Sequence, residues 1–364
     1  MKILYVINSP CWTEISPSGL NDQELFNDPL SENFTYFYYN LMKFGLIDKI
    51  CIFVPDHRWR VGGIVKDVID TEFGTLKLYK DSEKFKIINS DNNLNYVYCW
   101  SKWWECKNIK NKFIIVNPMF NGVSHKNYIN KNEHDFALIE GEMFRKFLPK
   151  NFPYAVCRLI NFDSEKASIV NNEKKIYDWI LISSFDPRKR HLEFLNQLIK
   201  SKLGNLKGCI IGRDPKNKKK KIIDFFFNSP WRVLKKIKNY QKKINFDLFI
   251  NLHQSKKIEL TKRSKIFVCT SKLDNGPRSQ IEAAQLCLPV LSMSHIGASD
   301  FINNENKNGE IVKRLDQIPQ KLEEMLINIE KYTCVNNKLI LSPQKFMPEI
   351  ISKILKAYNI KKNL

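Results

Sequence analysis

The stretch from Lys265 to Val290, KIFVCTSKLDNGPRSQIEAAQLCLPV, decides the fold. It begins with a short run of aliphatic and aromatic side chains, which predicts a buried strand over Ile266–Thr270. A turn containing Asn, Gly and Pro follows, then a helix over Ser279–Cys287 and a second strand over Pro289–Ser292. This order of strand, turn, helix and strand is typical of an α/β domain.

The same alternation continues on both sides of this stretch. In the second half we expect strands at Trp179–Ser183, Cys209–Ile211 and Leu248–Leu252, and helices at His191–Lys202, Ser255–Arg263, Asp316–Lys331 and Ser342–Tyr358. In the first half we expect a helix over Phe34–Gly45 and strands at Lys2–Ile7, Lys49–Val54, Asn95–Cys99, Phe113–Asn117, Phe136–Ile139 and Ala155–Leu159. The strands are apolar on both sides of the pleat, which indicates parallel sheets covered on both faces.

A polar segment over 161–175 separates the two halves. The sequence therefore predicts an α/β chain with two Rossmann-like doubly wound domains that face one another across a cleft. The first domain is expected over residues 1–170 and the second over 176–340. In sheets of this kind, ligands bind beyond the carboxyl ends of the strands, so the loops that follow strands are where we look for chemistry.

The chain is strongly basic. Its 364 residues carry a formal net charge of +21, which favours nucleic acid, anionic lipid headgroups or phosphorylated substrates as partners, although an AT-rich genome would also enrich lysine. Many lysines lie between Lys216 and Lys243, interleaved with aromatic residues up to Phe246. Three interpretations stay open: an amphipathic helix on an anionic membrane, a nucleic-acid contact, or a solvated helix that packs on its own domain.

The sequence also indicates where the protein resides. No apolar run is long enough to cross a membrane, and the short apolar N-terminus reads as a strand rather than a signal peptide. The nine cysteines form no Cys-x-x-Cys pair, so we expect reduced, mostly buried thiols. These features predict a cytoplasmic protein, with peripheral attachment to the inner membrane face as the alternative that the basic segment suggests.

The turn between the two quoted strands carries the most informative polar residues. Asp274 and Glu282 lie eight positions apart, on either side of Asn275, Gly276 and Pro277. This turn exposes backbone N–H groups at a helix start, where a phosphate or a sugar hydroxyl binds well. Two carboxylates beside it suit the hydroxyls of a nucleotide sugar.

Here the sequence resembles the retaining glycosyltransferases of the GT-B fold, in particular glycosyltransferase family 4. The family signature is an acidic residue, seven others and a Glu, followed by a small residue and a Pro-Val strand; this chain has Asp274, where the family usually has Glu, then Glu282, Ala283-Ala284 and Pro289-Val290. The resemblance implies that Glu282 holds the ribose hydroxyls and that Asp274 faces the donor sugar. It also implies donor contacts from the turn and the helix start, at Asn275, Gly276, Pro277, Arg278 and Ser279.

A second match lies where the strand 179–183 ends. The family has a Gly-Arg pair there and a Lys five residues after that Arg, and the two cations clamp the diphosphate. Lys189 stands at the lysine position, while Ser184 stands at the arginine position, so Arg188 or Arg190 is expected to supply the second charge. A cation pair here stabilises the negative charge that develops on the leaving diphosphate.

Weaker matches to the family pattern lie in the first domain. The loop after the first strand has a single glycine, Gly19, where the family keeps a Gly-containing loop near acceptor and phosphate. His125 follows a strand at a place where the family often has a donor-side His, and Glu142 is a candidate for the acceptor side. The last helix, within 342–364, is expected to pack back on the first domain, as in relatives.

The resemblance implies a retaining transfer of a sugar from a nucleotide diphosphate to a hydroxyl acceptor, a surface glycan or a lipid-linked oligosaccharide. No Asp-x-Asp motif is present, so neither a metal nor any other cofactor is expected. Two alternatives stay open: transfer to modified DNA bases, and a non-catalytic nucleic-acid-binding protein on a GT-B frame. A sugar epimerase of the same fold matches the signature less well.

Overall fold

The computed structural model describes residues 1–7, 33–56, 67–100, 103–117, 129–139, 141–157, 174–212, 230–252, 254–271, 278–294, 308–332 and 343–363. The chain divides into two compact units. Unit 1 is Met1–Phe162 with Ser342–Leu364, and unit 2 is Asp163–Leu341. Each is described below by itself.

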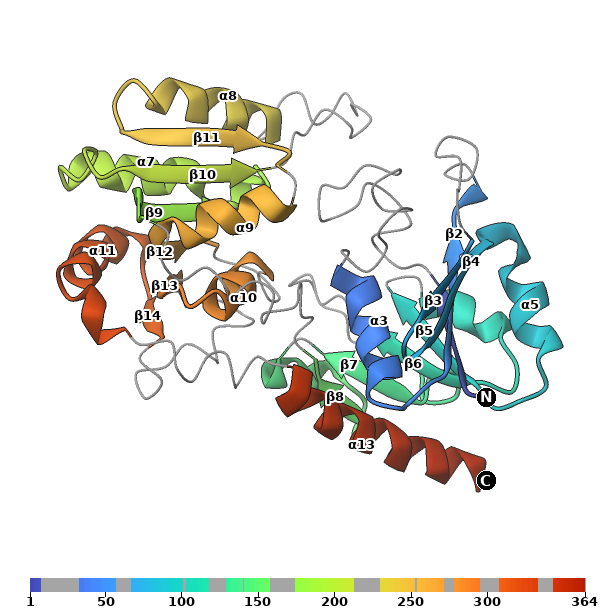
Figure 1. Ribbon diagram of the computed structural model, residues 1–364. Coiled ribbons are helices and arrows are strands. Elements are labelled where there is room, and N and C mark those ends of the chain that lie inside the picture. The colour runs from blue at the N-terminus through green and yellow to red at the C-terminus, as the bar shows by residue number, and fades with distance from the viewer. Residues whose placement is uncertain are drawn as a thin grey trace. The chain divides into compact units, whose positions relative to one another are not determined.

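Unit 1 is built on an eight-stranded sheet with the order β3-β4-β2-β1-β5-β6-β7-β8 (Figure 1). Its strands are β1 Ile3–Ile7, β2 Lys49–Val54, β3 Val68–Thr71, β4 Gly74–Lys80, β5 Tyr96–Trp100, β6 Phe113–Asn117, β7 Phe136–Ile139 and β8 Tyr154–Val156. Its α-helices are α3 Asn33–Lys43, α5 Lys84–Ser90 and α13 Pro343–Lys362, and 3-10 turns lie at Asp81–Glu83, Trp103–Asn108 and Glu142–Phe147. All neighbouring strands run parallel except β3 and β4.

The β3–β4 hairpin corrects the expectation of a purely parallel sheet. It lies in a part of the chain, together with α5, for which the sequence pattern predicts no element. Alternating exposure along β3 gives no long apolar run, and β4 begins directly after the turn with Gly74 at φ +147°. A Cβ on Gly74 would lie 2.2 Å from the carbonyl oxygen of Asp48, so only glycine fits this turn.

Helix α13 packs on the core of unit 1 although it follows unit 2 in the sequence. Met347, Ile350 and Ile354 are buried in the same core cluster as the strands β1, β2, β5 and β6. Near its end, the Tyr358 ring lies 4.9 Å from that of Tyr96, and the Tyr358 hydroxyl donates to the carbonyl of Leu94 at 2.6 Å.

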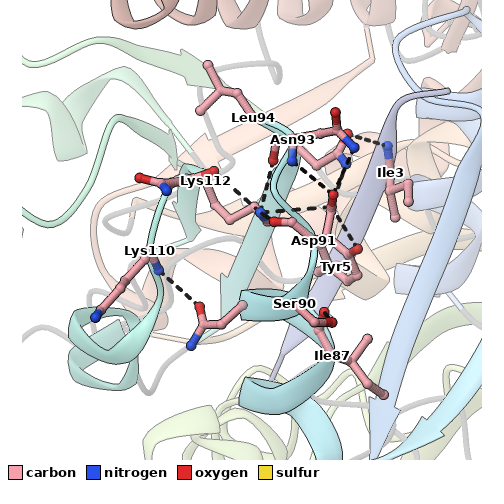
Figure 2. A network of polar contacts seen from close by, with 12 residues as sticks. Ile3, Tyr5, Ile87, Ser90, Asp91, Asn93, Leu94, Lys110 and Lys112 are labelled. Carbon is pink, nitrogen blue, oxygen red and sulfur yellow. Dashed lines mark hydrogen bonds and ion pairs between the residues drawn. The ribbon is translucent and has the colours of Figure 1, made fainter.

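A buried lysine organises the amino-terminal ends of the central strands (Figure 2). Lys112 directly precedes β6, and its ammonium donates to the carbonyls of Asp91 and, at 2.9 Å, of Asn93. The Asp91 carboxylate accepts from the Tyr5 hydroxyl at 2.9 Å and from the Asn95 amide at 2.7 Å. Burial lowers the pKa of Lys112 and the Asp91 charge opposes this, so the ammonium depends on its carbonyl partners.

Unit 2 is built on a six-stranded sheet with the order β11-β10-β9-β12-β13-β14, parallel throughout (Figure 1). Its strands are β9 Tyr177–Ile182, β10 Gly208–Gly212, β11 Phe246–Ile250, β12 Ser264–Cys269, β13 Val290–Met293 and β14 Gly309–Val312. Its α-helices are α7 His191–Lys200, α8 Pro230–Tyr240, α9 Gln254–Lys262, α10 Arg278–Gln285 and α11 Ile318–Ile327, with 3-10 turns at Pro187–Lys189, Leu315–Gln317 and Ile329–Lys331. The two parallel-sheet α/β units confirm the predicted pair of Rossmann-like domains.

Helix α8 lies within the basic segment, and its described part uses its apolar face inside the unit. Val233, Leu234 and Ile237 are buried in the core of unit 2. The exposed residues of the helix and the turn after it include Trp231, Arg232, Lys235, Lys236, Lys238, Lys242 and Lys243. A membrane helix that inserts this apolar face is therefore wrong for residues 230–243, because the face already packs on its own domain.

The structure also bears on the expectations about membrane-spanning helices and cysteines. Among the described residues, no helix is long and apolar enough to span a membrane. Six described cysteines, Cys51, Cys99, Cys106, Cys157, Cys209 and Cys269, are buried thiols. Cys287 is disulfide-bonded, so the expectation of reduced cysteines is wrong at this position.

We predict that Lys112→Met lowers the free energy of unfolding by about 3 kcal/mol, because it leaves buried carbonyls and a carboxylate without their cation. Urea denaturation measures this. The control is Lys110→Met, two residues away and exposed, which should change stability by less than about 0.5 kcal/mol. Equal stabilities of the two variants would contradict a structural role for Lys112.

Candidate donor site

The candidate site lies at the carboxyl edge of the unit 2 sheet, which we define as the ends of β9 and β12 with residues 183–191, 270–271 and 278–282. Strands β9 and β12 are neighbours and parallel, so their carboxyl ends meet at one edge. Ser183 directly follows β9, and Thr270 directly follows β12. This is the edge at which parallel α/β sheets bind ligands.

The segment after β9 is held in place by packing and by capping. Phe185 is buried against the end of β10, where a Cβ on Gly212 would lie 2.2 Å from its ring. The Asp186 carboxylate accepts from the backbone N–H of Arg188 at 2.9 Å and so caps the turn that carries Lys189. Arg190 then takes a left-handed conformation, φ 57°, and leads into α7.

Two hydrogen bonds bring the sequence motifs together. The Thr270 hydroxyl donates to the carbonyl of Lys189, which ties the turn after β9 to the end of β12. The Ser279 hydroxyl donates to the carbonyl of Ile182 at 2.8 Å, which ties the start of α10 to the end of β9. Lys189 and the start of α10 therefore lie at the same edge of the sheet.

Glu282 lies in α10, one turn after Ser279, and is 5% exposed. Its Oε2 atom is 3.2 Å from the Nζ atom of Lys257, which lies in the preceding helix α9. A carboxylate this deeply buried needs a cation or hydrogen-bond donors, and Lys257 supplies one. The pair holds the carboxylate beside the edge where α10 begins.

The other predicted cations differ in their surroundings. The Arg188 guanidinium is mostly exposed and binds Asp186 at 3.0 and 2.7 Å through two nitrogens. Partial burial raises the pKa of Asp186, but the hydrogen bonds and charge of Arg188 outweigh it and hold that pKa below its usual range. Arg190 directs Nη1 toward Met293 Sδ, 3.5 Å away at the end of β13, and Ser184 is exposed.

Several predicted site residues lie outside the described residues: Asp274, Asn275, Gly276, Pro277, His125 and Gly19. Arg278 is described only as the first residue of α10. Glu142 lies in unit 1, where its carboxylate accepts from the Tyr154 hydroxyl at 3.1 Å. The functional roles assigned to all these residues, and to Lys189 and Glu282, stay predictions.

His191 is a site neighbour that the sequence analysis missed. It is the first residue of α7, fully buried, and its Nε2 atom is 3.0 Å from the Ser183 hydroxyl. Burial, aided by the charge of Lys189, lowers its pKa to about 3, although Asp186 opposes this. A neutral imidazole therefore supports the segment that carries Lys189, and a lone His after a basic turn gives no sequence signal for such burial.

The edge presents cations, backbone N–H groups at a helix start and one buried carboxylate, a set that suits a phosphorylated ligand with hydroxyl groups. Among the residues that the structure describes, no group of three or more His, Cys, Asp or Glu side chains is placed to hold a metal ion.

The two α/β units with a ligand edge of this kind define the GT-B fold class. The solved structures that this chain resembles share that fold. A glycosyltransferase from Rickettsia africae is 19% identical with a TM-score of 0.60, and 98% of each chain is covered. Anabaena HepE, solved in complex with UDP, is 10% identical with a TM-score of 0.61, and both chains are covered fully.

TarM is 17% identical with a TM-score of 0.55 over 77% of this chain, which spans 59% of TarM's length. The sequence itself matches a family model: residues 162–338 match the glycosyl transferases group 1 family. The match covers slightly less than half of the chain and nearly coincides with unit 2. No curated protein matches the sequence.

We predict that acid destabilises the protein through His191. In the unfolded chain this residue binds a proton near pH 6.5, whereas the folded protein holds it neutral to about pH 3. The free energy of unfolding should therefore fall as the pH falls from 6.5 toward 4, by up to about 1.4 kcal/mol per pH unit from this residue. Urea midpoints of the wild type and of His191→Gln measure it. The variant should show the smaller slope, and equal slopes would contradict the buried neutral imidazole.

Proposed function

We propose that the protein is a retaining glycosyltransferase of the family 4 type, which moves a sugar from a nucleoside diphosphate to a hydroxyl acceptor in polysaccharide or glycolipid synthesis. One observation carries the proposal. The hydrogen bonds of Thr270 and Ser279 hold the Lys189 turn and the start of α10 at a single edge of the unit 2 sheet. One bound nucleotide sugar would meet both.

The residues of this edge are proposed to bind different parts of the donor. Lys189 is partly exposed, and its ammonium is proposed to contact the diphosphate, with Arg190 as the second cation. Glu282 is a buried hydrogen-bond acceptor, so we assign to it the ribose hydroxyls rather than the diphosphate. HepE, solved with UDP and also with UDP and glucose, shows that a protein of this fold binds both parts of such a donor.

The chemistry needs little from the protein beyond position and charge. The bond between the anomeric carbon and the diphosphate oxygen breaks, the acceptor oxygen bonds to that carbon on the same face, and the acceptor proton passes to the departing phosphate oxygen. The products are the glycoside and the nucleoside diphosphate. Lys189 and Arg190 stabilise the charge that grows on the diphosphate, which is the main barrier-lowering effect expected here.

We predict that Lys189→Met lowers the rate of donor hydrolysis or transfer about 100-fold, because it removes a cation from the leaving diphosphate. A thermal-shift panel of UDP-, GDP- and ADP-sugars first identifies the donor, since a ligand that binds the folded state raises the midpoint. Release of nucleoside diphosphate from that donor then measures the rate.

Two variants accompany this test. Lys200→Met removes an exposed lysine at the end of α7 and should leave the rate unchanged. Arg190→Gly keeps the left-handed backbone and removes one guanidinium, so a loss of rate without a loss of stability assigns the second charge to Arg190. A wild-type rate in Lys189→Met would refute the diphosphate clamp.

For the acceptor we propose a glycan or lipid-linked oligosaccharide at an anionic membrane surface. Residues 230–243 carry six cations and no acidic residue, and their exposed side chains include Trp231, 46% exposed. Because the apolar face of α8 is buried, the contact would be electrostatic, at about 1 kcal/mol for each cation near the surface. The alternatives, DNA as acceptor and a non-catalytic nucleic-acid-binding frame, use the same charge, but the family match favours an enzyme over the latter.

We predict that vesicles with about 30% anionic lipid recover the protein in flotation, that neutral vesicles do not, and that high salt abolishes recovery. The triple change of Lys235, Lys236 and Lys238 to Glu should abolish recovery too. The control changes Lys345, Lys356 and Lys362 of α13 to Glu, an equal change in net charge at other exposed positions. Equal loss in both variants, or stronger binding to duplex DNA than to vesicles, would refute the membrane surface.

A further inference from the structure

We propose that Lys257 is a positioning residue that makes the donor site specific for ribonucleotides. Its ammonium lies 3.2 Å from Oε2 of Glu282 and sets the orientation of the carboxylate that receives the ribose hydroxyls. The inference rests on the proposed function of Glu282 and adds a residue from another helix, α9, to the site.

The contact is distinct from the ordinary ion pairs of α9. Lys256, the preceding residue, bonds Glu259 within the same helix at 2.7 Å, and both side chains are substantially exposed. Lys257 turns the other way and crosses to α10, with its side chain only 15% exposed and that of Glu282 6% exposed. The two lysines are neighbours of the same type, one on a solvated face and one beside the site.

Stability alone does not account for a buried ion pair. Removing two charges from water costs about as much as their attraction returns, and well-packed apolar residues in the same place are often at least as stabilising. A buried pair next to a ligand edge instead provides a carboxylate of fixed direction. Since a carboxylate only accepts hydrogen bonds, its natural ligand is a group with two O–H donors, such as the 2′- and 3′-hydroxyls of ribose.

Fixing the carboxylate matters because its orientation decides how well two hydroxyls bond at once. In Glu282 the ammonium holds one oxygen, and Ser279, one turn earlier, ties the same helix to β9. Without Lys257, the carboxylate would lose this restraint and turn. This change weakens the ribose contact and leaves contacts to the diphosphate intact, so the loss should appear only for ligands that carry the hydroxyls.

Calorimetric titration tests this with whichever of UDP, GDP and ADP binds most tightly, and with its 2′,3′-dideoxy counterpart. We predict that the wild type prefers the ribonucleotide by about 30-fold, the value of one or two charge-assisted hydrogen bonds. Lys257→Met should bind the ribonucleotide about tenfold more weakly and the dideoxynucleotide within twofold of the wild type. Lys256→Met, the matched control, should behave as the wild type does, and Lys257→Arg should keep most of the preference.

The outcomes distinguish the ribose contact of Glu282 from the positioning role of Lys257. A wild type that binds both nucleotides equally refutes the ribose contact of Glu282, and the inference with it. A wild-type preference that persists in Lys257→Met refutes Lys257 alone, as does an equal loss for both nucleotides, which would mean general damage to the site. Tighter ribonucleotide binding in Lys257→Met would show that the lysine occupies the ribose position. Should this variant fail to fold, Lys257→Gln, which also removes the cation, gives the same comparison.

Discussion

The hydrogen bond from the Ser279 hydroxyl to the carbonyl of Ile182 is the contact on which the candidate site depends. It joins the start of α10 to the end of β9, two places separated by almost a hundred residues of sequence. Parallel pairing of β9 and β12 makes the meeting possible, and the Thr270 hydroxyl adds a second bond of the same direction, to the carbonyl of Lys189. Two hydroxyls of the stretch 265–290 thus hold the backbone at the end of β9 and in the turn after it.

Unit 1 has a polar network at the amino-terminal ends of its strands. Lys112, Asp91 and Asn95 connect the starts of β1, β5 and β6, and Lys361 near the end of α13 bonds the carbonyl of Lys112 and the carboxylate of Asp135 at 2.7 Å each. The network fixes the amino-terminal edge of the sheet. Parallel sheets bind ligands at their carboxyl edge, so this network lies at the edge that such ligands do not use.

Sequence reasoning recovers the elements whose signal is local. Apolar runs such as those of β1, β6 and β12 predict strands, because a strand buried on both faces is apolar along its whole length. The β3–β4 hairpin was missed because its exposure alternates and its turn depends on a glycine packed against Asp48. The placement of α8 needed the core of unit 2, since its lysines alone fit three interpretations.

The residues of the site show the same difference between local sequence patterns and contacts made by packing. The spacing of Asp274 and Glu282 and the position of Lys189 are visible in the sequence, because a motif is a local pattern. The partnership of Glu282 with Lys257 and the support of Lys189 by the neutral His191 are not, because they arise from packing between elements. No pattern of residue types distinguishes Lys257 from Lys256, yet only one of them points to the site.

Arg190 is the cation that the proposed function assigns in place of the one absent at Ser184. A non-glycine residue in the left-handed region costs roughly 1 kcal/mol, and glycine would avoid this cost at φ 57°. The arginine instead carries a guanidinium to the end of β13, at the edge where Lys189 and α10 meet. Arg188 is bound to Asp186 and serves its own turn. The left-handed backbone at Arg190 thus accompanies a guanidinium at this edge, where the proposed function assigns it the second charge.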